Sequence, residues 1–189
     1  MRIGIIGIGA MGWNVARAFM RGPNEVLVRD IRDEANEIAE LGGATVCASP
    51  AAIARESDAI LTFVVDGPQT EEIMFGTDGA AAALKPGQLV LLCSTMAADE
   101  VASIGARLAE RGAVVLDTPV SGGPDHAREG ALTMMVACTR AALDQARPVF
   151  DYMARDVFHI SETLGDGARV KLVNNMLAGT NLTATAEAL

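Results

Sequence analysis

The sequence predicts an α/β fold with a doubly wound, mostly parallel sheet, and three observations support this prediction. Short apolar runs rich in β-branched residues alternate along the chain with amphipathic stretches. The apolar runs do not alternate with polar residues, which is typical of parallel strands covered by helices on both faces. Half of the 189 residues are hydrophobic and only 4% are aromatic, so we expect a sizeable core of aliphatic side chains and methionine.

In the first half of the chain, the predicted strands are four apolar segments, over 2–7, 25–30, 58–65 and 88–94. Amphipathic stretches over 10–22 and 33–43 follow the first two strands, and each runs into glycine, which commonly terminates a helix. Short helical segments are expected to flank the other two strands. This order is typical of parallel strands joined by crossover helices.

The second half of the chain continues the alternation. Val101, Ile104 and Leu108 lie close to helical spacing, so residues 98–112 are expected to form a helix. Further helices are predicted over 140–154, where Pro148 is a candidate kink, and from 166 to the end of the chain. The remaining strands are predicted over 113–120, 132–138 and 156–160.

The last predicted helix has no obvious end. It runs from Asp166 to Leu189 without a terminal glycine, proline or capping residue. A helix with an apolar side needs a surface to pack against. We therefore expect that the natural protein continues beyond this helix or that the helix docks on a second copy, and that residues 1–189 self-associate.

Charge and cysteine content argue against several classes of function. The formal net charge is −9 and no basic run is present, so a nucleic-acid partner is not expected. No apolar run is long enough to span a bilayer, so no membrane partner is expected either. Cys47, Cys93 and Cys138 are widely spaced and form no CxxC or Cys/His pair, so neither a metal site nor a disulfide framework is predicted. Scattered single thiols indicate a cytoplasmic protein.

The stretch IGIIGIGAMG, residues 3–12, has three interpretations: a glycine-rich buried strand, a secretion signal or a nucleotide site. Glycines interrupt the apolar run and no cleavage pattern follows, which argues against a secretion signal. The spacing Gly7-x-Gly9-x-x-Gly12 falls between a predicted strand and a predicted helix. There the first glycine permits a tight turn, the second allows a pyrophosphate to approach, and the third allows the helix to pack on the strand. The stretch therefore predicts a dinucleotide site.

An acidic residue at the end of the second strand specifies the kind of dinucleotide. Asp30 ends that strand, eighteen residues after Gly12. A carboxylate at this place accepts hydrogen bonds from both ribose hydroxyls and repels a 2′-phosphate, so NAD is favoured over NADP. Arg29 and Arg32 leave an alternative open, because either could contact a 2′-phosphate, or both could belong to a solvated turn.

Two further segments contain residues that could carry chemistry. Ser121, Gly122 and Gly123 precede a proline, so we expect neither regular helix nor central strand there. They form either a loop whose N–H groups and hydroxyl hold an anion, or a surface turn. Lys171 and Asn175 are four residues apart and share one face of the last helix. Lys171 either extends to solvent or, if its pKa is lowered by burial, acts as a base.

Four motifs occur together and in order: GIGAMG, CSTM, DTPVSGGP and GDGARVKLVNN. With these motifs the chain resembles the β-hydroxyacid dehydrogenase family, which includes 3-hydroxyisobutyrate dehydrogenases, tartronate semialdehyde reductases and L-threonate dehydrogenases. The resemblance implies a Rossmann-type NAD-binding domain over 1–163. It also implies that residues 164–189 form the first part of a long interdomain helix, which is truncated in this chain. An all-helical C-terminal domain, absent from this chain, would follow.

The resemblance also implies roles for individual residues. The pyrophosphate and ribose would be held by Gly7, Gly9, Ala10, Met11, Gly12 and Asp30. The nicotinamide side of the cofactor would lie against Val64, Val65, Ser94 and Thr95. The substrate carboxylate would be held by Ser121, Gly122 and Gly123. Lys171 would be the catalytic lysine and Asn175 its partner.

The implied function is hydride transfer between NAD and a small 3-hydroxy acid, similar to 3-hydroxyisobutyrate, threonate or glycerate, with the lysine as general acid and base. The implied partners are this carboxylate substrate and a second copy of the protein, bound through the last helix and the missing domain. The chain by itself is expected to bind cofactor with little or no turnover. The alternative, from a different class, is a non-catalytic NAD(H)-binding module or redox sensor.

The chain departs from the family pattern at a few positions. Val65 replaces the usual proline, which places the chain closer to the threonate dehydrogenase-like branch. His126 stands where many members have glycine, and either tunes substrate choice or is an exposed loop residue. Asp117 is expected to end its strand without a catalytic role.

Overall fold

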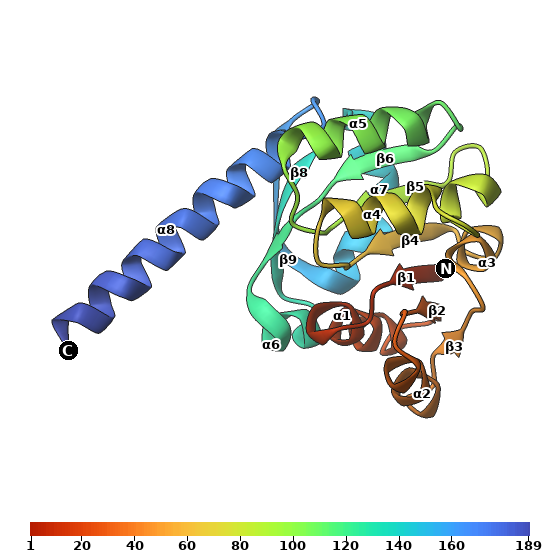
Figure 1. Ribbon diagram of the computed structural model, residues 1–189, viewed down its shortest axis with the longest axis horizontal. Helices are drawn as coiled ribbons and strands as arrows, with labels where there is room; N and C mark the ends of the chain where they lie inside the picture. Colours follow the sequence, from red (N-terminus) through yellow and green to blue (C-terminus); the bar gives the residue numbers. More distant parts are fainter.

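A nine-stranded sheet runs through the protein, with helices on both of its faces (Figure 1). The structure is a computed structural model that describes residues 1–189. Parallel pairing joins six strands in the order β3 (Thr45–Val46), β2 (Glu25–Arg29), β1 (Arg2–Ile6), β4 (Ala59–Thr62), β5 (Leu89–Leu92) and β6 (Val114–Asp117). The strand order reverses between β1 and β4, and ligands of such sheets bind at the carboxyl ends of the strands beside this point. The predicted doubly wound, mostly parallel sheet is confirmed.

The strands beyond β6 give the sheet a mixed edge. The strand β8 (Leu132–Ala137) pairs antiparallel with β6 and with β7 (Val120–Ser121), and β9 (Ala154–Ser161) pairs parallel with β8. The prediction of one strand over 113–120 is wrong, because β6 ends at Asp117 and β7 is separate. Pro119 lies between them and has no N–H to donate to a ladder. This break carries the chain from β5, which pairs with β6, to β8, which pairs with β7.

Two helical layers enclose the sheet, and each covers its own hydrophobic core. One face is covered by α1 (Ala10–Met20), α2 (Asp33–Leu41), α6 (Gly123–Glu129) and α7 (Arg140–Met153). The other face is covered by α3 (Pro50–Glu56), α4 (Gly67–Phe75), the 3-10 turn η1 (Ala80–Ala83) and α5 (Ala98–Ala109). The buried side chains are mostly aliphatic, as the low aromatic content predicts.

The structure bears on three further predictions. The strand expected over 58–65 ends at Thr62, so the next three residues form a loop at the carboxyl edge of the sheet. The helix over Arg140–Met153 is continuous through Pro148. The expectation that residues 121–124 form no regular helix is wrong, because Gly123 begins α6, whose first turn contains a proline. Ser121 ends β7, a two-residue strand at the edge of the sheet, so the expectation of no central strand there holds. Proline suits a first helical turn because N–H groups there have no intrahelical partner.

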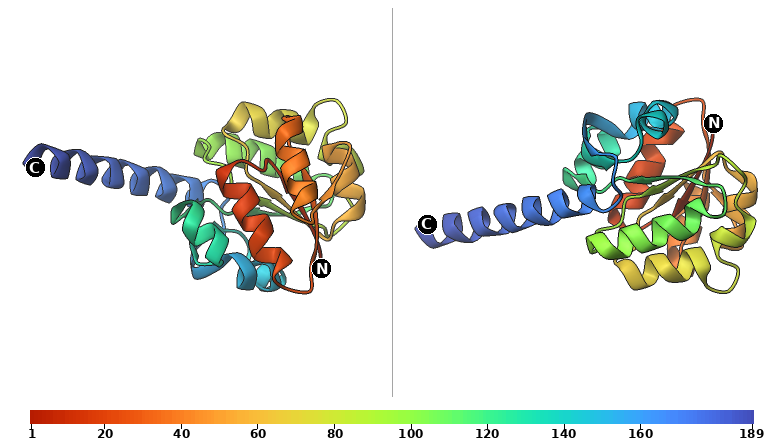
Figure 2. Two further views of the ribbon diagram at one scale, coloured as in Figure 1. Left: turned by 90° about the horizontal axis from the view of Figure 1, so that it is seen from below. Right: turned by 90° about the horizontal axis from the view of Figure 1, so that it is seen from above.

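The last helix, α8 (Asp166–Ala188), projects away from the rest of the protein (Figures 1 and 2). It contacts the body only through its first turns, where Gly167, Ala168 and Lys171 are its buried residues. Farther along, α8 exposes large apolar side chains at Val173, Met176, Leu177 and Leu182. No helix of the structure combines the length and apolar character that crossing a membrane requires.

Candidate active site

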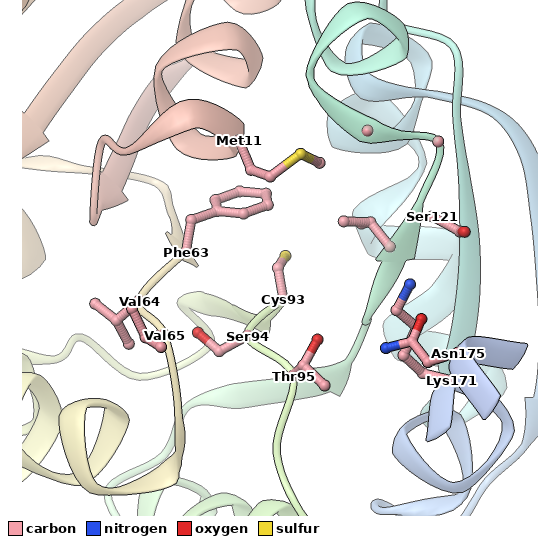
Figure 3. Close-up of a pocket in the computed structure, with 13 residues that line it drawn as sticks. Met11, Phe63, Val64, Val65, Cys93, Ser94, Thr95, Ser121, Lys171 and Asn175 are labelled. Carbon is pink, nitrogen blue, oxygen red and sulfur yellow. The ribbon is translucent and has the colours of Figure 1, made fainter. Parts of the chain in front are cut away.

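A pocket of about 350 Å³ lies at the carboxyl edge of the sheet, where the loops after β4 and β5 face β7 and α8 (Figure 3). Residues from one side of it are Met11, Phe63, Val64, Val65, Cys93, Ser94 and Thr95. Residues from the other side are Val120, Ser121, Gly122, Gly123, Lys171 and Asn175. The structure therefore brings into one pocket the residues predicted to contact nicotinamide, the residues predicted to hold a carboxylate, and the predicted lysine. Sequence reasoning missed Phe63, Cys93 and Val120, although Cys93 and Val120 belong to the motifs CSTM and DTPVSGGP.

The glycine turn between β1 and α1 is tightly packed at two of its three glycines. Gly7 has φ +90°, and a Cβ there would lie 2.7 Å from the Phe63 carbonyl oxygen. A Cβ on Gly12 would lie 1.9 Å from the Gly7 carbonyl oxygen. Gly9 differs, because the nearest atom to its added Cβ would be Arg32 Nη2, at 3.8 Å. Gly7 and Gly12 are required by the fold, whereas the space in front of Gly9 is open to a ligand.

The start of α1 is able to bind an anion. Gly9 is its N-cap residue, and no side chain caps the helix there. The first backbone N–H groups of a helix have no intrahelical partners, and the helix dipole favours negative charge at this end. Ala10 and Met11 form the first turn and Met11 reaches the pocket, so a pyrophosphate at this turn would lie beside the pocket.

Asp30 lies at the end of β2, close to the glycine turn, and is 7% exposed. Its Oδ2 accepts the Ile8 N–H at 2.9 Å, and both of its oxygens accept hydrogen bonds from the Arg32 guanidinium, at 2.9 and 3.0 Å. Burial raises the pKa of Asp30, but hydrogen bonds from Arg32 and Ile8 outweigh it and hold this pKa below its ordinary value. Arg32 is thus an ion-pair partner of Asp30 rather than part of a wholly solvated turn. Asp30, Gly7, Gly9, Ala10 and Gly12 lie outside the lining of the pocket itself.

Lys171 is 9% exposed and points from α8 into the pocket (Figure 3). Burial is the one cause that shifts its pKa, and it lowers this pKa below the ordinary value of lysine. No carboxylate forms an ion pair with the Lys171 ammonium. A lysine in this condition is neutral more readily than an exposed lysine and is able to accept a proton. Asn175, one turn farther along α8, lines the same pocket but is exposed.

The segment from Ser121 to Gly123 lines the same side of the pocket as Lys171 (Figure 3). Gly122 and Gly123 have φ values of +131° and +77°, which side chains other than glycine rarely adopt. The Gly122 carbonyl oxygen lies 2.7 Å from Nδ1 of His126, an exposed residue on α6. Ser121 Oγ accepts a hydrogen bond from Asn174 Nδ2 at 3.4 Å, so Asn174, which sequence reasoning missed, links α8 to this segment.

Two hydroxyl residues follow β5 and lie on the opposite wall. Ser94 Oγ is buried without a hydrogen-bond partner, and Thr95 is exposed. A buried hydroxyl without a partner is rare in native proteins and is satisfied when a ligand supplies one. The preceding residue, Cys93, is deeply buried beside Thr118 Oγ1, and burial raises the pKa of its thiol to about 12.

The end of β6 holds a second feature that sequence reasoning missed. The prediction that Asp117 ends its strand is confirmed, but its carboxylate also reaches α8. Its Oδ2 accepts the N–H groups of Gly165 at 2.9 Å and Ala168 at 3.1 Å. Burial raises the pKa of Asp117 to about 6, against the lowering effect of these N–H groups.

Comparison with known proteins places most of the chain in one domain family. The family model described as the NAD binding domain of 6-phosphogluconate dehydrogenase matches residues 2–161. An L-threonate dehydrogenase of Cupriavidus necator is 41% identical over 99% of this chain and 63% of its own length. A 2-hydroxy-3-oxopropionate reductase of Escherichia coli is 32% identical over 100% of this chain and 64% of its own length.

A solved structure gives the same result. The crystal structure of a 3-hydroxyisobutyrate dehydrogenase from Salmonella typhimurium superposes on this chain with a TM-score of 0.92 and 35% sequence identity. The match covers 100% of this chain and 66% of that one. The chain therefore spans less than two thirds of the length of these relatives.

Proposed function

The chain belongs to the β-hydroxyacid dehydrogenase family, as the NAD-binding domain of such a protein, and we propose that the whole protein transfers a hydride between NAD and a small 3-hydroxy acid. One observation carries this proposal. A buried lysine without an anionic partner lines a pocket at the carboxyl edge of the sheet together with segment 121–123. NAD is the cofactor of this domain type, and when bound it supplies the hydride acceptor.

The residues of the chain fit that cofactor. The uncapped first turn of α1 and the open space at Gly9 would hold the pyrophosphate. Asp30 would hold the adenosine ribose, and its negative charge disfavours a 2′-phosphate, so we propose NAD rather than NADP. Val64, Val65, Ser94 and Thr95 would line the nicotinamide side, where the unpaired Ser94 hydroxyl has hydrogen-bonding capacity to spare.

The proton chemistry belongs to Lys171 in this proposal. Oxidation of an alcohol removes a hydride from carbon and a proton from oxygen. Lys171 Nζ would take the hydroxyl proton as general base and return it in the reverse reaction. Asn175, on the same face of α8, would orient the hydroxyl. Ser121, Gly122 and Gly123 would bind the substrate carboxylate, and thereby set the distance between that carboxylate and the reacting hydroxyl.

The competing function is an NAD(H)-binding module or redox sensor without catalysis. Thiol-based sensing is disfavoured, because Cys47, Cys93 and Cys138 are all buried and burial raises the pKa of each. A pure binding module also has no use for a lysine buried at a desolvation cost on this face of α8. The buried lysine therefore favours an enzyme over a non-catalytic NAD(H)-binding module.

We infer two further properties of the whole protein. Its relatives are longer than this chain, and the exposed apolar side chains of α8 need a partner surface, so we propose a homo-oligomer joined through α8 and the following part of the protein. The three free cysteines support a location in the reducing cytoplasm.

The test is NADH formation by the full-length protein, followed by absorbance with NAD and a panel of 3-hydroxyisobutyrate, L-threonate, D-glycerate and L-serine. We expect turnover of one of these acids, with NADP a poorer acceptor than NAD. No NADH formation with any acid of the panel, from a protein that still binds NADH, would contradict the proposal and favour the redox sensor.

A further inference from the structure

We propose that Asp117 is a positioning residue for Lys171: its carboxylate caps α8 from within the sheet and thereby holds the lysine at its place in the pocket. The effect on turnover rests on the function proposed above, whereas the effect on α8 does not. Asp117 does not line the pocket, so its action on catalysis would pass through the helix that carries Lys171.

The first turn of α8 has no cap of its own. Gly165 is the N-cap residue and has no side chain to accept a hydrogen bond. Asp166, the acidic residue of this turn, is engaged elsewhere, by Ser161 Oγ and the Arg169 guanidinium. The N–H groups of Gly165 and Ala168 instead reach Oδ2 of Asp117, 48 and 51 residues earlier in the chain. A distant side chain therefore does what a neighbouring serine or aspartate does at most helix starts.

The anchor is rigid because Asp117 belongs to the interior of the sheet. It is fully buried at the last position of β6, in parallel register with Leu92 of β5 and antiparallel register with Ala137 of β8. The sheet fixes the position of the carboxylate, and the carboxylate in turn fixes the position of the first turn of α8. A negative charge at this end of a helix is also favoured by the helix dipole.

The glycines around the start of α8 allow this close approach. A Cβ on Gly165 would lie 2.5 Å from the Ala98 carbonyl oxygen. A Cβ on Gly167 would lie 2.5 Å from the Met135 carbonyl oxygen and 3.0 Å from Asp117 Oδ2. Gly165 thus lets the start of α8 lie against the first residue of α5, and Gly167 lets it lie against β8 and the Asp117 carboxylate. This explains the sequence Gly-Asp-Gly immediately before the lysine turn.

Apart from Asp117, the side-chain hydrogen bonds that hold α8 to the body are those of Asp166 with Ser161 and of Asn174 with Ser121. Beyond its first turns the helix leaves the body of the protein (Figures 1 and 2), and after Lys171 no residue of it is buried. Lys171 lies one turn after Ala168, so a small change at the anchored turn moves the ammonium directly. A misplacement of about 1 Å in an active site can lower a rate by about 100-fold.

The cost of this arrangement argues that it does more than stabilise the fold. Asp117 Oδ1 is buried without a hydrogen-bond partner. A buried carboxylate with one unpaired oxygen is an expensive way to cap a helix, since a neutral side chain would carry a smaller desolvation cost. Proteins retain such unfavourable buried groups mainly at functional sites.

The experiment uses the full-length protein and the variants Asp117→Ala and Asp117→Asn. The alanine variant removes the acceptor, whereas the asparagine variant keeps an oxygen of nearly the same shape without the charge. Ser49→Ala is the matched control, because Ser49 caps α3 through the Ala52 N–H in a helix that contributes nothing to the pocket. Each protein is measured for NAD affinity, for kcat and KM on the acid found active, and for amide hydrogen exchange over residues 165–172.

With Asp117→Ala we expect faster amide exchange over 165–172 and a kcat lower by about 10- to 100-fold, at an NAD affinity within about two-fold of the parent. Asp117→Asn should recover part of both properties, because its oxygen accepts the same two N–H groups. Ser49→Ala should change exchange only in α3 and leave kcat unaltered. A purely structural role would lower NAD binding and kcat together.

Unchanged exchange over 165–172 in Asp117→Ala would overturn the proposal, as would a kcat within about two-fold of the parent. If the alanine variant does not fold, the asparagine variant decides: exchange and kcat both equal to those of the parent overturn the proposal. A parent protein inactive on every acid would count against the proposed function. The exchange measurement would still test whether Asp117 stabilises the first turn of α8.

Discussion

Single residues of the glycine turn separate what the fold needs from what the cofactor needs. We predict that Gly12→Ala destabilises the protein by about 3 kcal/mol or more, because its Cβ would overlap the Gly7 carbonyl oxygen at 1.9 Å. Gly9→Ala should leave the melting temperature nearly unchanged, since Gly9 has φ −68° and open space around its added Cβ, yet it should abolish NAD binding. Thermal unfolding and titration with NAD measure both effects. A Gly9→Ala variant that binds NAD normally would show that the pyrophosphate does not approach there.

The raised pKa of Asp117 makes a prediction about stability. A carboxyl whose pKa is raised by burial from 3.8 to about 6 binds its proton more tightly in the folded protein than in the unfolded chain. Its contribution to the free energy of unfolding therefore falls as the pH rises through this window and stays low above it. Asp117→Asn removes this contribution. Relative to the parent, the free energy of unfolding of the variant should rise by on the order of 2 kcal/mol between pH 4 and pH 7.

Urea unfolding of both proteins at a series of pH values measures this difference. Parallel pH profiles for parent and variant would show that Asp117 titrates at an ordinary pKa in the folded protein. Together with the exchange experiment, the profile separates the charge of Asp117 from its role as a hydrogen-bond acceptor.

Residue types with a strong local requirement were predictable from the sequence. The spacing of Gly7 and Gly12 predicts the turn, and the position of Asp30 at the end of a strand predicts its place beside the cofactor. Asp117 could not be recognised, because its partners, Gly165 and Ala168, are about 50 residues away and offer only backbone N–H groups. The Asp30–Arg32 ion pair was not predicted either, because the sequence left Arg32 as a contact to a 2′-phosphate or as part of a solvated turn.

At the level of elements, α8 is the helix that has an apolar side without a packing partner in residues 1–189. Val170, Val173 and Leu177 lie on one side of it and are 37%, 53% and 54% exposed. We predict that residues 1–189 self-associate with increasing concentration, and that Val173→Glu with Leu177→Lys restores a monomer. Sedimentation velocity over a concentration series measures this. A monomer at every concentration in the unsubstituted chain would mean that these side chains are covered in some other way.

The elements themselves were largely predictable, because apolar runs and helix stops are local signals. The errors fall where tertiary contacts decide. The segment expected as one strand over 113–120 divides because the chain moves from pairing with β5 to pairing with β8. The strand after residue 58 stops at Thr62 although Phe63, Val64 and Val65 are apolar, because these residues line the pocket instead of joining the sheet. Apolar composition does not distinguish a strand from a pocket wall.

At the scale of the whole molecule, the topology explains why residues far apart in the sequence meet. The loops after β4 and β5 open at the carboxyl edge of parallel strands, beside the point where the strand order reverses. The antiparallel return through β8 and β9 then brings α8 back to this edge, so that Lys171 lies on the same side of the pocket as Ser121 and opposite Ser94. The site is therefore a product of the sheet order, which motif spacing alone does not reveal.

The most direct test of this account compares the full-length protein with its Lys171→Met variant, in NADH formation from the active 3-hydroxy acid and in NAD affinity. We predict that kcat falls by about 10²- to 10⁴-fold, as for loss of a positioned base, whereas NAD affinity is retained. Turnover in Lys171→Met comparable to that of the parent would contradict the assignment of Lys171 as the proton acceptor.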